Sequence, residues 1–379
     1  MNKRWPFTLN IFLFAAGASV LPFMVLYYQE LGFTGAQIGL ITGITPLIIF
    51  FIAPLWAGIA DSTGRHRLIL SIAILGSAVS LFVFPFLSTF PTVLLIAIVL
   101  NLFLAPVVPF VDSATMFMLG DKKEMYGRIR LGGTIGYGLA APIAGGLVQN
   151  YSLMVAFWAS SIFLIASLFF SQKLVYPRME ADNPTRGGIR IILSNPRWLL
   201  FLILAFFGGM SLAVFNNYFF SYMTEVGAKE SMMGLALTVG TISEIPILFY
   251  GNKLIKKFKA YGLIMLSMVV TGLRSILFAV AGSTTIVLFI QLLSGLTFAA
   301  FWIAGVSFAD DNAPPGLHTT AQGLFSAMVM GIGTAVGGFI GGLLLGSIGG
   351  RNLYLVFGII VLIVTAIIAV IYSRLPEED

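Results

Sequence analysis

Long apolar stretches separated by short polar turns make up most of the chain. Each stretch reaches about 20 residues, the length that an α-helix needs to cross the hydrocarbon core of a bilayer. Backbone groups have no water to bond in that core, so helices are the expected element. The pattern predicts twelve membrane spans, at residues 7–29, 37–60, 68–88, 92–119, 128–150, 152–172, 197–222, 232–251, 260–280, 284–309, 319–348 and 352–373.

The composition favours a membrane protein over a soluble one. Apolar residues make up 58% of the chain and charged residues 9%, and the mean hydropathy is +0.99. A soluble globular protein carries roughly 25% charged residues, so this chain has too few to coat a water-exposed surface. The absence of cysteine excludes disulfides and thiolate metal sites. The sequence shows neither an acid–base or nucleophile set of a soluble enzyme nor a nucleic-acid-binding module. We therefore expect no enzyme activity, no cofactor, no metal and no nucleic-acid partner.

The distribution of Lys and Arg predicts the orientation. With the N-terminus placed in the cytoplasm, 18 of the 21 basic residues fall at inner loops or ends. Lys229 and Arg351 fall outside, and Arg274 lies within a span. Inner loops of membrane proteins carry such an excess, so the net charge of +6 reflects topology rather than an anionic partner. We expect a multi-pass protein of the bacterial inner membrane with both termini in the cytoplasm.

One long polar stretch divides the chain. Residues 173–196 contain Pro177, Pro184 and four basic residues, which is the composition of a cytoplasmic linker between the sixth and seventh spans. The expected fold is an all-α membrane protein built from two pseudo-symmetric six-helix bundles, at residues 1–172 and 197–379. Two repeated halves with a site between them are the architecture that permits alternating access.

Glycine-rich segments recur at corresponding places in the two halves. Gly133-Thr134 in the fifth span and Gly333-Thr334 in the eleventh each open such a segment. Small residues let membrane helices approach closely. Static packing explains any single glycine equally well, but the paired occurrence favours a moving interface between helices.

A charged loop lies between the second and third spans, in the sequence Gly58-Ile59-Ala60-Asp61-Ser62-Thr63-Gly64-Arg65-His66-Arg67. An ordinary basic turn would require neither the glycines nor the acid. The loop resembles the signature of the major facilitator superfamily of transporters, G-x-x-x-D-x-x-G-R-[RKH]-[RK]. The resemblance implies twelve helices, alternating access, and a conformational gate formed by Gly58, Asp61, Gly64, Arg65 and Arg67.

The same resemblance implies a partner for Asp61. In the superfamily this acid meets the cytoplasmic start of the eleventh helix when the inner gate is closed. Residues 314–322 here predict a turn followed by a helix start. A helix N-terminus favours an anion, at roughly 1 kcal/mol, so we expect Asp61 to lock one conformation.

Ionisable residues inside spans are costly in lipid and usually serve function. Asp112 lies in the fourth span, Arg130 just inside the fifth, Glu244 in the eighth and Arg274 in the ninth. Asp112 and Arg130 are within reach across a hairpin of two helices, either as a structural ion pair or as part of a substrate or proton site. Glu244 has no obvious basic partner at its depth, which favours a functional role.

The run YGRIRLGGTIGY at residues 126–137 resembles the fifth-helix entry of the lactose-permease-like branch, which includes phenylpropionate and nucleoside proton symporters. In lactose permease an acid 18 positions before the equivalent arginine binds the sugar with it, and Asp112 precedes Arg130 by 18 positions. The resemblance also implies that Tyr137 stacks on the solute and that Glu244 and Arg274 correspond to site residues of the permease.

The tenth span departs from that branch. Where lactose permease has Lys, His and Glu for proton handling, this chain has Gln291, Ser294 and Thr297. That proton route is therefore not expected here. The sequence predicts a proton-coupling group of Glu244, Asp112 and Arg274. It predicts a substrate-binding group of Asp112, Arg130, Tyr137, Asn217 and Glu244, in which Asn217 is a polar interruption of the seventh span.

The leading hypothesis is a monomeric secondary transporter that imports a small polar organic solute, sugar- or nucleoside-like, together with protons. The alternative is a proton-coupled efflux antiporter for sugars or drugs. Its support is the run at residues 141–146, which is half of the antiporter-type pattern G-x-x-x-G-P-x-x-G-G, together with the triplet Glu244-Ile245-Pro246. A third possibility is a membrane sensor or lipid scramblase on the same scaffold.

Overall fold

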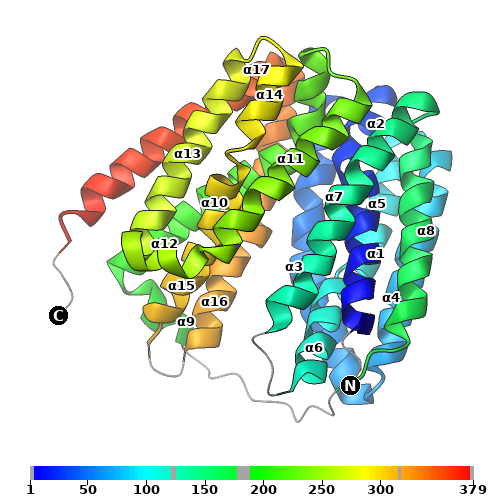
Figure 1. The fold of residues 1–379 in the computed structure, drawn as a ribbon, viewed down its shortest axis with the longest axis horizontal. Coiled ribbons are helices and arrows are strands. Elements are labelled where there is room, and N and C mark those ends of the chain that lie inside the picture. The colour runs from blue at the N-terminus through cyan, green and yellow to red at the C-terminus, as the bar shows by residue number, and fades with distance from the viewer. Residues whose placement is uncertain (1–3, 121–124, 177–187, 315–316, 376–379) are drawn as a thin grey trace. The chain divides into compact units, whose positions relative to one another are not determined.

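The computed structural model describes residues 4–120, 125–176, 188–314 and 317–375. Helices account for nearly all of these residues, and none of them lies in a β-strand (Figure 1). The middle of the predicted linker, residues 177–187, lies outside the described residues. The first half contains α1 (Arg4–Val20), η1 (Leu21–Phe23), α2 (Met24–Glu30), α3 (Gly35–Thr63), α4 (His66–Val83), η2 (Phe84–Phe86), α5 (Phe90–Leu104), α6 (Val107–Leu119), α7 (Tyr126–Asn150) and α8 (Met154–Ser171).

The second half contains two π-helical turns, η4 and η5, in addition to α-helices. Its elements are α9 (Gly188–Leu193), α10 (Pro196–Glu225), α11 (Glu230–Phe249), α12 (Gly251–Phe258), α13 (Ala260–Val280), α14 (Thr284–Gln291), η4 (Gly295–Ala299), α15 (Ala300–Asp311), α16 (His318–Ser326), η5 (Ala327–Gly333) and α17 (Thr334–Tyr372).

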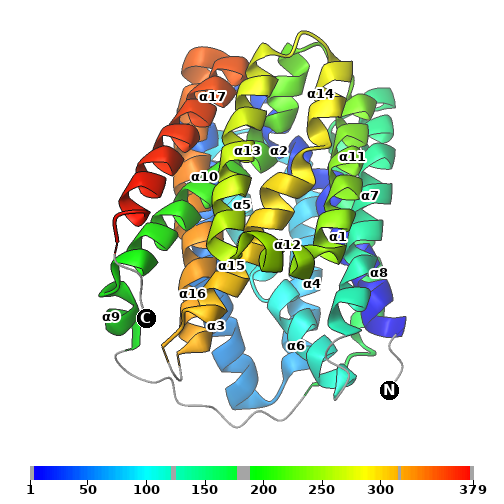
Figure 2. The same ribbon diagram turned by 60° about the vertical axis from the view of Figure 1, so that its left-hand side comes forward.

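Eleven helical segments of the described residues are long and apolar enough to cross a membrane. The last of them, Thr320–Tyr372, has 53 residues. At 1.5 Å per residue it would extend about 80 Å, more than twice the hydrocarbon thickness. It is broken at Gly349, where φ is 78°, and the chain turns back near the top of α17 (Figure 2). The break falls between the predicted spans at 319–348 and 352–373, and the count of twelve crossings stays a prediction.

The chain divides into two compact units. Unit 1 comprises Met1–Asp182 and Ala228–Thr238, and unit 2 comprises Asn183–Gly227 and Val239–Asp379. The division after residue 182 falls inside the predicted linker. The first half of α11, however, groups with unit 1, because its backbone packs directly on that of α7.

Hydrogen-bonding caps fix where several of these helices begin. Thr34 and Gln37 form a capping box at the start of α3, in which each side chain bonds the backbone of the other. Asn195 accepts from the backbone N–H of Arg197 at the start of α10. Such side chains satisfy N–H groups that lack a partner within the helix.

Unit 1 is built around a backbone contact between α1 and α7. The helix α1 packs against α7 and α8. At Gly132 and Gly136 of α7, an added methyl group would meet the carbonyl oxygens of Phe7 and Ile11. Only glycine permits this approach, which confirms the expected close packing of the fifth span.

Unit 2 repeats the arrangement with α10 in the place of α1. The helix α10 packs against η5 and α17. Methyl groups added at Gly333 and Gly337 would meet the backbone of Phe206 and of Met210. The glycine segments of the two halves therefore serve the same purpose, which is to bring two membrane helices into backbone contact.

We expect Gly136→Ala to destabilise the protein, because its Cβ would collide with the Ile11 carbonyl and force α1 and α7 apart. Overpacking of this kind costs about 1–3 kcal/mol or more, and it outweighs the helix propensity that alanine gains over glycine, about 1 kcal/mol. Thermal unfolding of the detergent-solubilised protein measures the effect.

The control is Gly146→Ala in the same helix, where an added methyl group has open space around it. Its melting temperature should equal or exceed that of the wild type. We call this backbone contact of α1 and α7 at Gly132 and Gly136, and its counterpart in unit 2 at Gly333 and Gly337, a glycine seam. Equal melting temperatures for both variants would contradict the seam in unit 1.

Candidate functional site

A buried arginine in unit 2 organises the polar residues of that unit. Arg274 lies on α13 and is 6% exposed. Its Nη1 donates to Thr297 Oγ1 at 2.9 Å, and its Nη2 donates to Gln291 Oε1. The guanidinium also lies over the rings of Phe215 and Phe278, at 4.5 and 5.3 Å. A cation in an apolar bundle requires partners of this kind to offset the loss of water.

The acid of α11 adjoins this group. Glu244 is half-buried, and its Oε1 accepts a hydrogen bond of 3.2 Å from Ser294 Oγ. The carbonyl of Ser294 in turn accepts from Thr297 Oγ1 at 2.8 Å. A chain of hydrogen bonds thus connects Glu244 to Arg274 through Ser294 and Thr297. The structure brings the two predicted proton-coupling residues of unit 2 into one network.

The π-helical turn η4 lies at the centre of this network. It widens the helix at Gly295–Ala299. The backbone N–H of Gly295, its first residue, donates to Ser243 Oγ of α11 at 3.1 Å. A methyl group at Gly295 would meet the Ser243 carbonyl oxygen, so α11 and η4 are in backbone contact. Single π-turns within helices occur frequently at functional sites. The sequence signal for Ser294 and Thr297 is their spacing with Gln291, which places all three on one side of a helix.

Two donors of the network have no hydrogen-bond partner among the described residues. They are Arg274 Nε and Gln291 Nε2, and Gln291 is fully buried. A buried unsatisfied donor costs about 1–3 kcal/mol. The group therefore has hydrogen-bonding capacity beyond what the protein itself uses.

In unit 1, Arg130 of α7 contacts α1. Arg130 Nη1 donates to Asn10 Oδ1 of α1 at 3.2 Å, and the guanidinium lies 4.0 Å from the centre of the Phe14 ring. No ion pair joins Arg130 to Asp112 in the described part of the chain. Asn10 is 2% exposed, and its Nδ2 donates to the Pro6 carbonyl, so its oxygen is oriented for Arg130. In the sequence, Asn10 stands out as an amide within the first apolar run.

Asp112 is half-buried on α6, beside the hydroxyl of Tyr126 at the start of α7, with Arg130 in electrostatic range. Tyr137 is half-buried on α7. The predicted unit 1 residues therefore lie on α6 and α7, with Asn10 of α1 joining them. Asn217 lies half-buried on α10 in unit 2.

The charged loop turns at Gly64, which closes α3 in the left-handed conformation with φ 66°. Asp61 pairs with His66 at 2.8 Å across the turn, and Arg67 Nη2 donates to the Leu174 carbonyl at 2.9 Å.

Arg65 is exposed. Gly58 is also exposed, and a methyl group there would meet nothing. Gly64, in contrast, is required by its backbone angle, and the gate role of the loop stays a prediction.

The imidazole of His66 stacks on the ring of Tyr176 at 5.3 Å. Burial raises the pKa of the Tyr176 hydroxyl, and the charge of Arg67 opposes that rise. Tyr176 thus remains neutral at physiological pH, and its aromatic ring packs against the imidazole of His66. The predicted contact of Asp61 with the eleventh helix stays a prediction.

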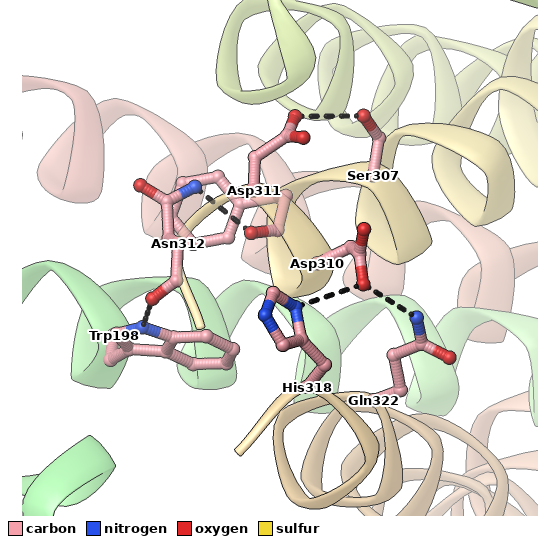
Figure 3. Close-up of polar contacts among 8 residues, drawn as sticks. Trp198, Ser307, Asp310, Asp311, Asn312, His318 and Gln322 are labelled. Carbon is pink, nitrogen blue, oxygen red and sulfur yellow. Dashed lines mark hydrogen bonds and ion pairs between the residues drawn. The ribbon is translucent and has the colours of Figure 1, made fainter. Parts of the chain in front are cut away.

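Unit 2 has a corresponding cluster where α15 ends and α16 begins (Figure 3). Asp310 Oδ1 accepts from Gln322 Nε2 and pairs with His318 Nδ1, each at 3.2 Å. Asp311 accepts from Ser307 at 3.0 Å. Each histidine of the chain, His66 and His318, is thereby paired with an aspartate across a turn between two helices.

Comparison with known proteins gives a family match over most of the chain. A model described as the MFS_1 like family matches residues 8–356. Similar proteins include the uncharacterized transporter YwbF of Bacillus subtilis, 28% identical over 92% of this chain and 88% of its own. The maltose permease of Geobacillus stearothermophilus is 25% identical, with 98% and 95% covered. The putative nucleoside transporter YegT of Escherichia coli is 23% identical, with 91% and 84% covered.

Solved structures share the fold. The nucleoside transporter NupG superposes with a TM-score of 0.87, over 99% of this chain and 100% of that one, at 19% identity. A bacterial homologue of the human lysosomal transporter Spinster gives a TM-score of 0.76, over 97% and 95%, at 13% identity. At these identities the likeness establishes the fold and not the substrate.

We expect Thr297→Val to destabilise the protein by about 1–3 kcal/mol, because it removes the acceptor of Arg274 Nη1 and leaves a further buried donor unsatisfied. Thermal unfolding in detergent measures the loss.

The matched control is Thr365→Val in α17. Thr365 is 2% exposed and Thr297 is 4% exposed, but the hydroxyl of Thr365 bonds only the carbonyl of Val361 in its own helix. Its variant should unfold close to the wild-type temperature. A similar loss of thermal stability in both variants would mean that the bond to Arg274 stabilises the protein no more than a hydrogen bond within one helix does.

Proposed function

The chain belongs to the MFS_1-like family of membrane transporters, and from this membership we propose that it imports a small polar organic solute together with protons. Transport rather than enzyme catalysis is what the family and the relatives establish. The names of those relatives, a maltose permease and a putative nucleoside transporter, support a sugar- or nucleoside-like solute. The protein would act by alternating access, as a monomer of twelve spans in the bacterial inner membrane with both termini cytoplasmic.

The observation that carries the proton coupling is the placement of Glu244. Its carboxylate has one neutral donor, Ser294, and forms no ion pair among the described residues. A carboxylate in an apolar bundle without a bound cation is costly to keep ionised. Proton uptake removes that cost, so the protonated state is the one suited to a conformational change within the membrane.

Solute binding can use the same network. Arg274 and Gln291 retain unsatisfied donors, and Ser294 links them to Glu244. A hydroxyl-bearing solute that engages Glu244 would change the hydrogen bonding of Ser294 and hence of the whole group. Protonation and solute binding at one carboxyl are then thermodynamically linked, which is the requirement for symport.

The remaining predicted residues complete the proposal. Asp112 and Arg130 would bind solute hydroxyls from unit 1, Tyr137 would stack on a ring, and Asn217 would contribute an amide. Asp112 and Arg274 would take part in the proton transfer with Glu244. The loop residues Gly58, Asp61, Gly64, Arg65 and Arg67 would act as the conformational gate.

The alternative, a proton-coupled efflux antiporter for sugars or drugs, has one supporting observation. The run at 141–146 is in backbone contact with the first half of α11, since methyl groups at Gly145 and Gly234 would meet the carbonyls of Glu230 and Ala141. The antiporter-like half-motif is thus a packing surface for the helix that carries Glu244. Proton flux distinguishes the two readings, because a symporter takes up protons with the solute and an antiporter releases them.

We expect candidate sugars and nucleosides, added to a lightly buffered suspension of de-energised cells expressing the protein, to cause external alkalinisation. Glu244→Gln should abolish this proton uptake while equilibrium exchange of the solute continues, since a permanently neutral side chain still permits the conformational change. Acidification of the external medium on solute addition would contradict symport and support the antiporter alternative.

The control variant is Glu230→Gln, which neutralises an acid in the first turn of the same helix. It should transport protons as the wild type does. Proton uptake that survives in Glu244→Gln would exclude Glu244 as the carrier.

We also expect Asp61→Asn to shift the population towards the inward-open state, because it removes the charge that the gate holds at the start of the eleventh helix. Double electron–electron resonance between spin labels on the two halves measures the shift. Ser62→Ala, which loses only a bond to its own helix at the Ile59 carbonyl, should leave the distances unchanged. Unchanged distances in Asp61→Asn as well would exclude the lock.

A further inference from the structure

A short basic helix, α12, connects the membrane helices α11 and α13 in unit 2 (Figure 1). Its sequence, GNKLIKKF, places Lys253, Lys256 and Lys257 within one arc of about 100° when positions are counted at 3.6 residues per turn. Leu254 and Ile255 occupy the opposite side and pack on the buried core of the unit. The helix is therefore amphipathic, with its apolar side seated and its basic side facing outward.

Specific contacts hold α12 in this position. A methyl group at Gly251 would meet the side chain of Ile303 on α15, so the helix begins in close contact with that neighbour. The chain then leaves α12 at Lys259, whose φ of 58° is the only positive φ of a non-glycine residue among those described. This turn directs the chain into α13 and fixes the direction of the basic side.

The positive charge of α12 has no counter-charge among the residues that the structure describes. Lys253, Lys256, Lys257 and Lys259 are all exposed, and none forms an ion pair in the described part of the chain. No acid occurs between residues 245 and 309. The acids that end α15, Asp310 and Asp311, are already bonded within their own cluster. The charge is thus available to an anion from outside the protein.

Aromatic rings accompany the lysines. Phe249 is 80% exposed, Tyr250 50% and Phe258 40%. The Lys253 ammonium lies 5.2 Å from the centre of the Tyr250 ring, and the Lys257 ammonium 5.3 Å from that of Phe258. Exposed aromatics next to lysines at the end of a membrane helix match the boundary between head groups and acyl chains. A turn that faced only water would gain nothing from exposing three large rings.

We propose that α12 and its flanking aromatics form a binding surface for anionic phospholipid head groups. The lysines would bind the phosphates, and Phe249, Tyr250 and Phe258 would lie at the level where the acyl chains begin. Charge complementarity and the position between two membrane helices select a lipid over a free anion. The inference is independent of the transported solute.

The test compares binding of phosphatidylglycerol to the full-length protein in neutral phosphatidylcholine nanodiscs, with bound lipid counted by native mass spectrometry. The triple variant Lys253→Gln, Lys256→Gln, Lys257→Gln should bind it about fivefold more weakly for each lysine removed, which is the attraction of one basic residue to an anionic surface. High salt should weaken the wild-type binding. The variant Lys253→Arg, Lys256→Arg, Lys257→Arg should retain binding and shows that the helix is intact.

The charge-matched control is Lys173→Gln, Lys229→Gln, Arg351→Gln, which removes three exposed basic residues elsewhere. It should bind phosphatidylglycerol as the wild type does. An unchanged affinity in the α12 glutamine variant would overturn the proposal, as would an equal loss in the control. Equal competition by inorganic phosphate at the same concentration would also overturn it, because the surface would then be a simple anion site.

Discussion

The burial of the Arg274 guanidinium is the constraint to which the polar structure of unit 2 is fitted. A cation placed among Phe215 and Phe278 must find its hydrogen-bond acceptors within the protein. Gln291 and Thr297 provide them, and Thr297 faces α13 from within the π-helical turn η4. At the start of the same turn the Gly295 N–H donates to Ser243, and the preceding residue, Ser294, donates to Glu244. The acceptors of this one buried charge, the π-helical turn and the acid of α11 therefore form one connected group.

The glycine seams set the geometry in which such networks form. Glycines bring the backbone of α7 into contact with that of α1, and the backbones of η5 and α17 into contact with that of α10. In unit 1 the same contact lets Arg130 of α7 reach Asn10 of α1 across the seam. Small residues in membrane helices thus do more than permit packing, because they decide which polar side chains meet. The seam also explains why Arg130 bonds Asn10 although Asp112 lies 18 positions before it on the neighbouring helix.

Much of this could be predicted from the sequence, for identifiable reasons. Apolar runs locate the membrane helices because lipid tolerates little else, and charges such as Glu244 and Arg274 stand out because they are rare there. The charged loop predicted membership of the major facilitator superfamily, and the family model that matches residues 8–356 confirms it. The partner of Arg130 could not be predicted, since it lies 120 residues away. The π-turns leave no mark in composition, because they shift hydrogen bonds by one residue and not the polarity pattern. The grouping of the first half of α11 with unit 1 depends on Gly234, whose role only the packing reveals.

The two halves also share a feature that motif comparison misses. The loop signature has an acid at Asp61, and the corresponding loop of the second half, at α12, has lysines and no acid. The carboxylate–histidine pair of unit 2 is found instead at the next hairpin but one, as Asp310 with His318. Both pairs join the end of one membrane helix to the start of the next. Each half thus has one aspartate–histidine pair across a turn between helices, but the two pairs lie at different turns. The lysines of α12 therefore have no acidic partner among the described residues, and their exposure beside aromatic rings is the physical reason for seeking a partner in the membrane.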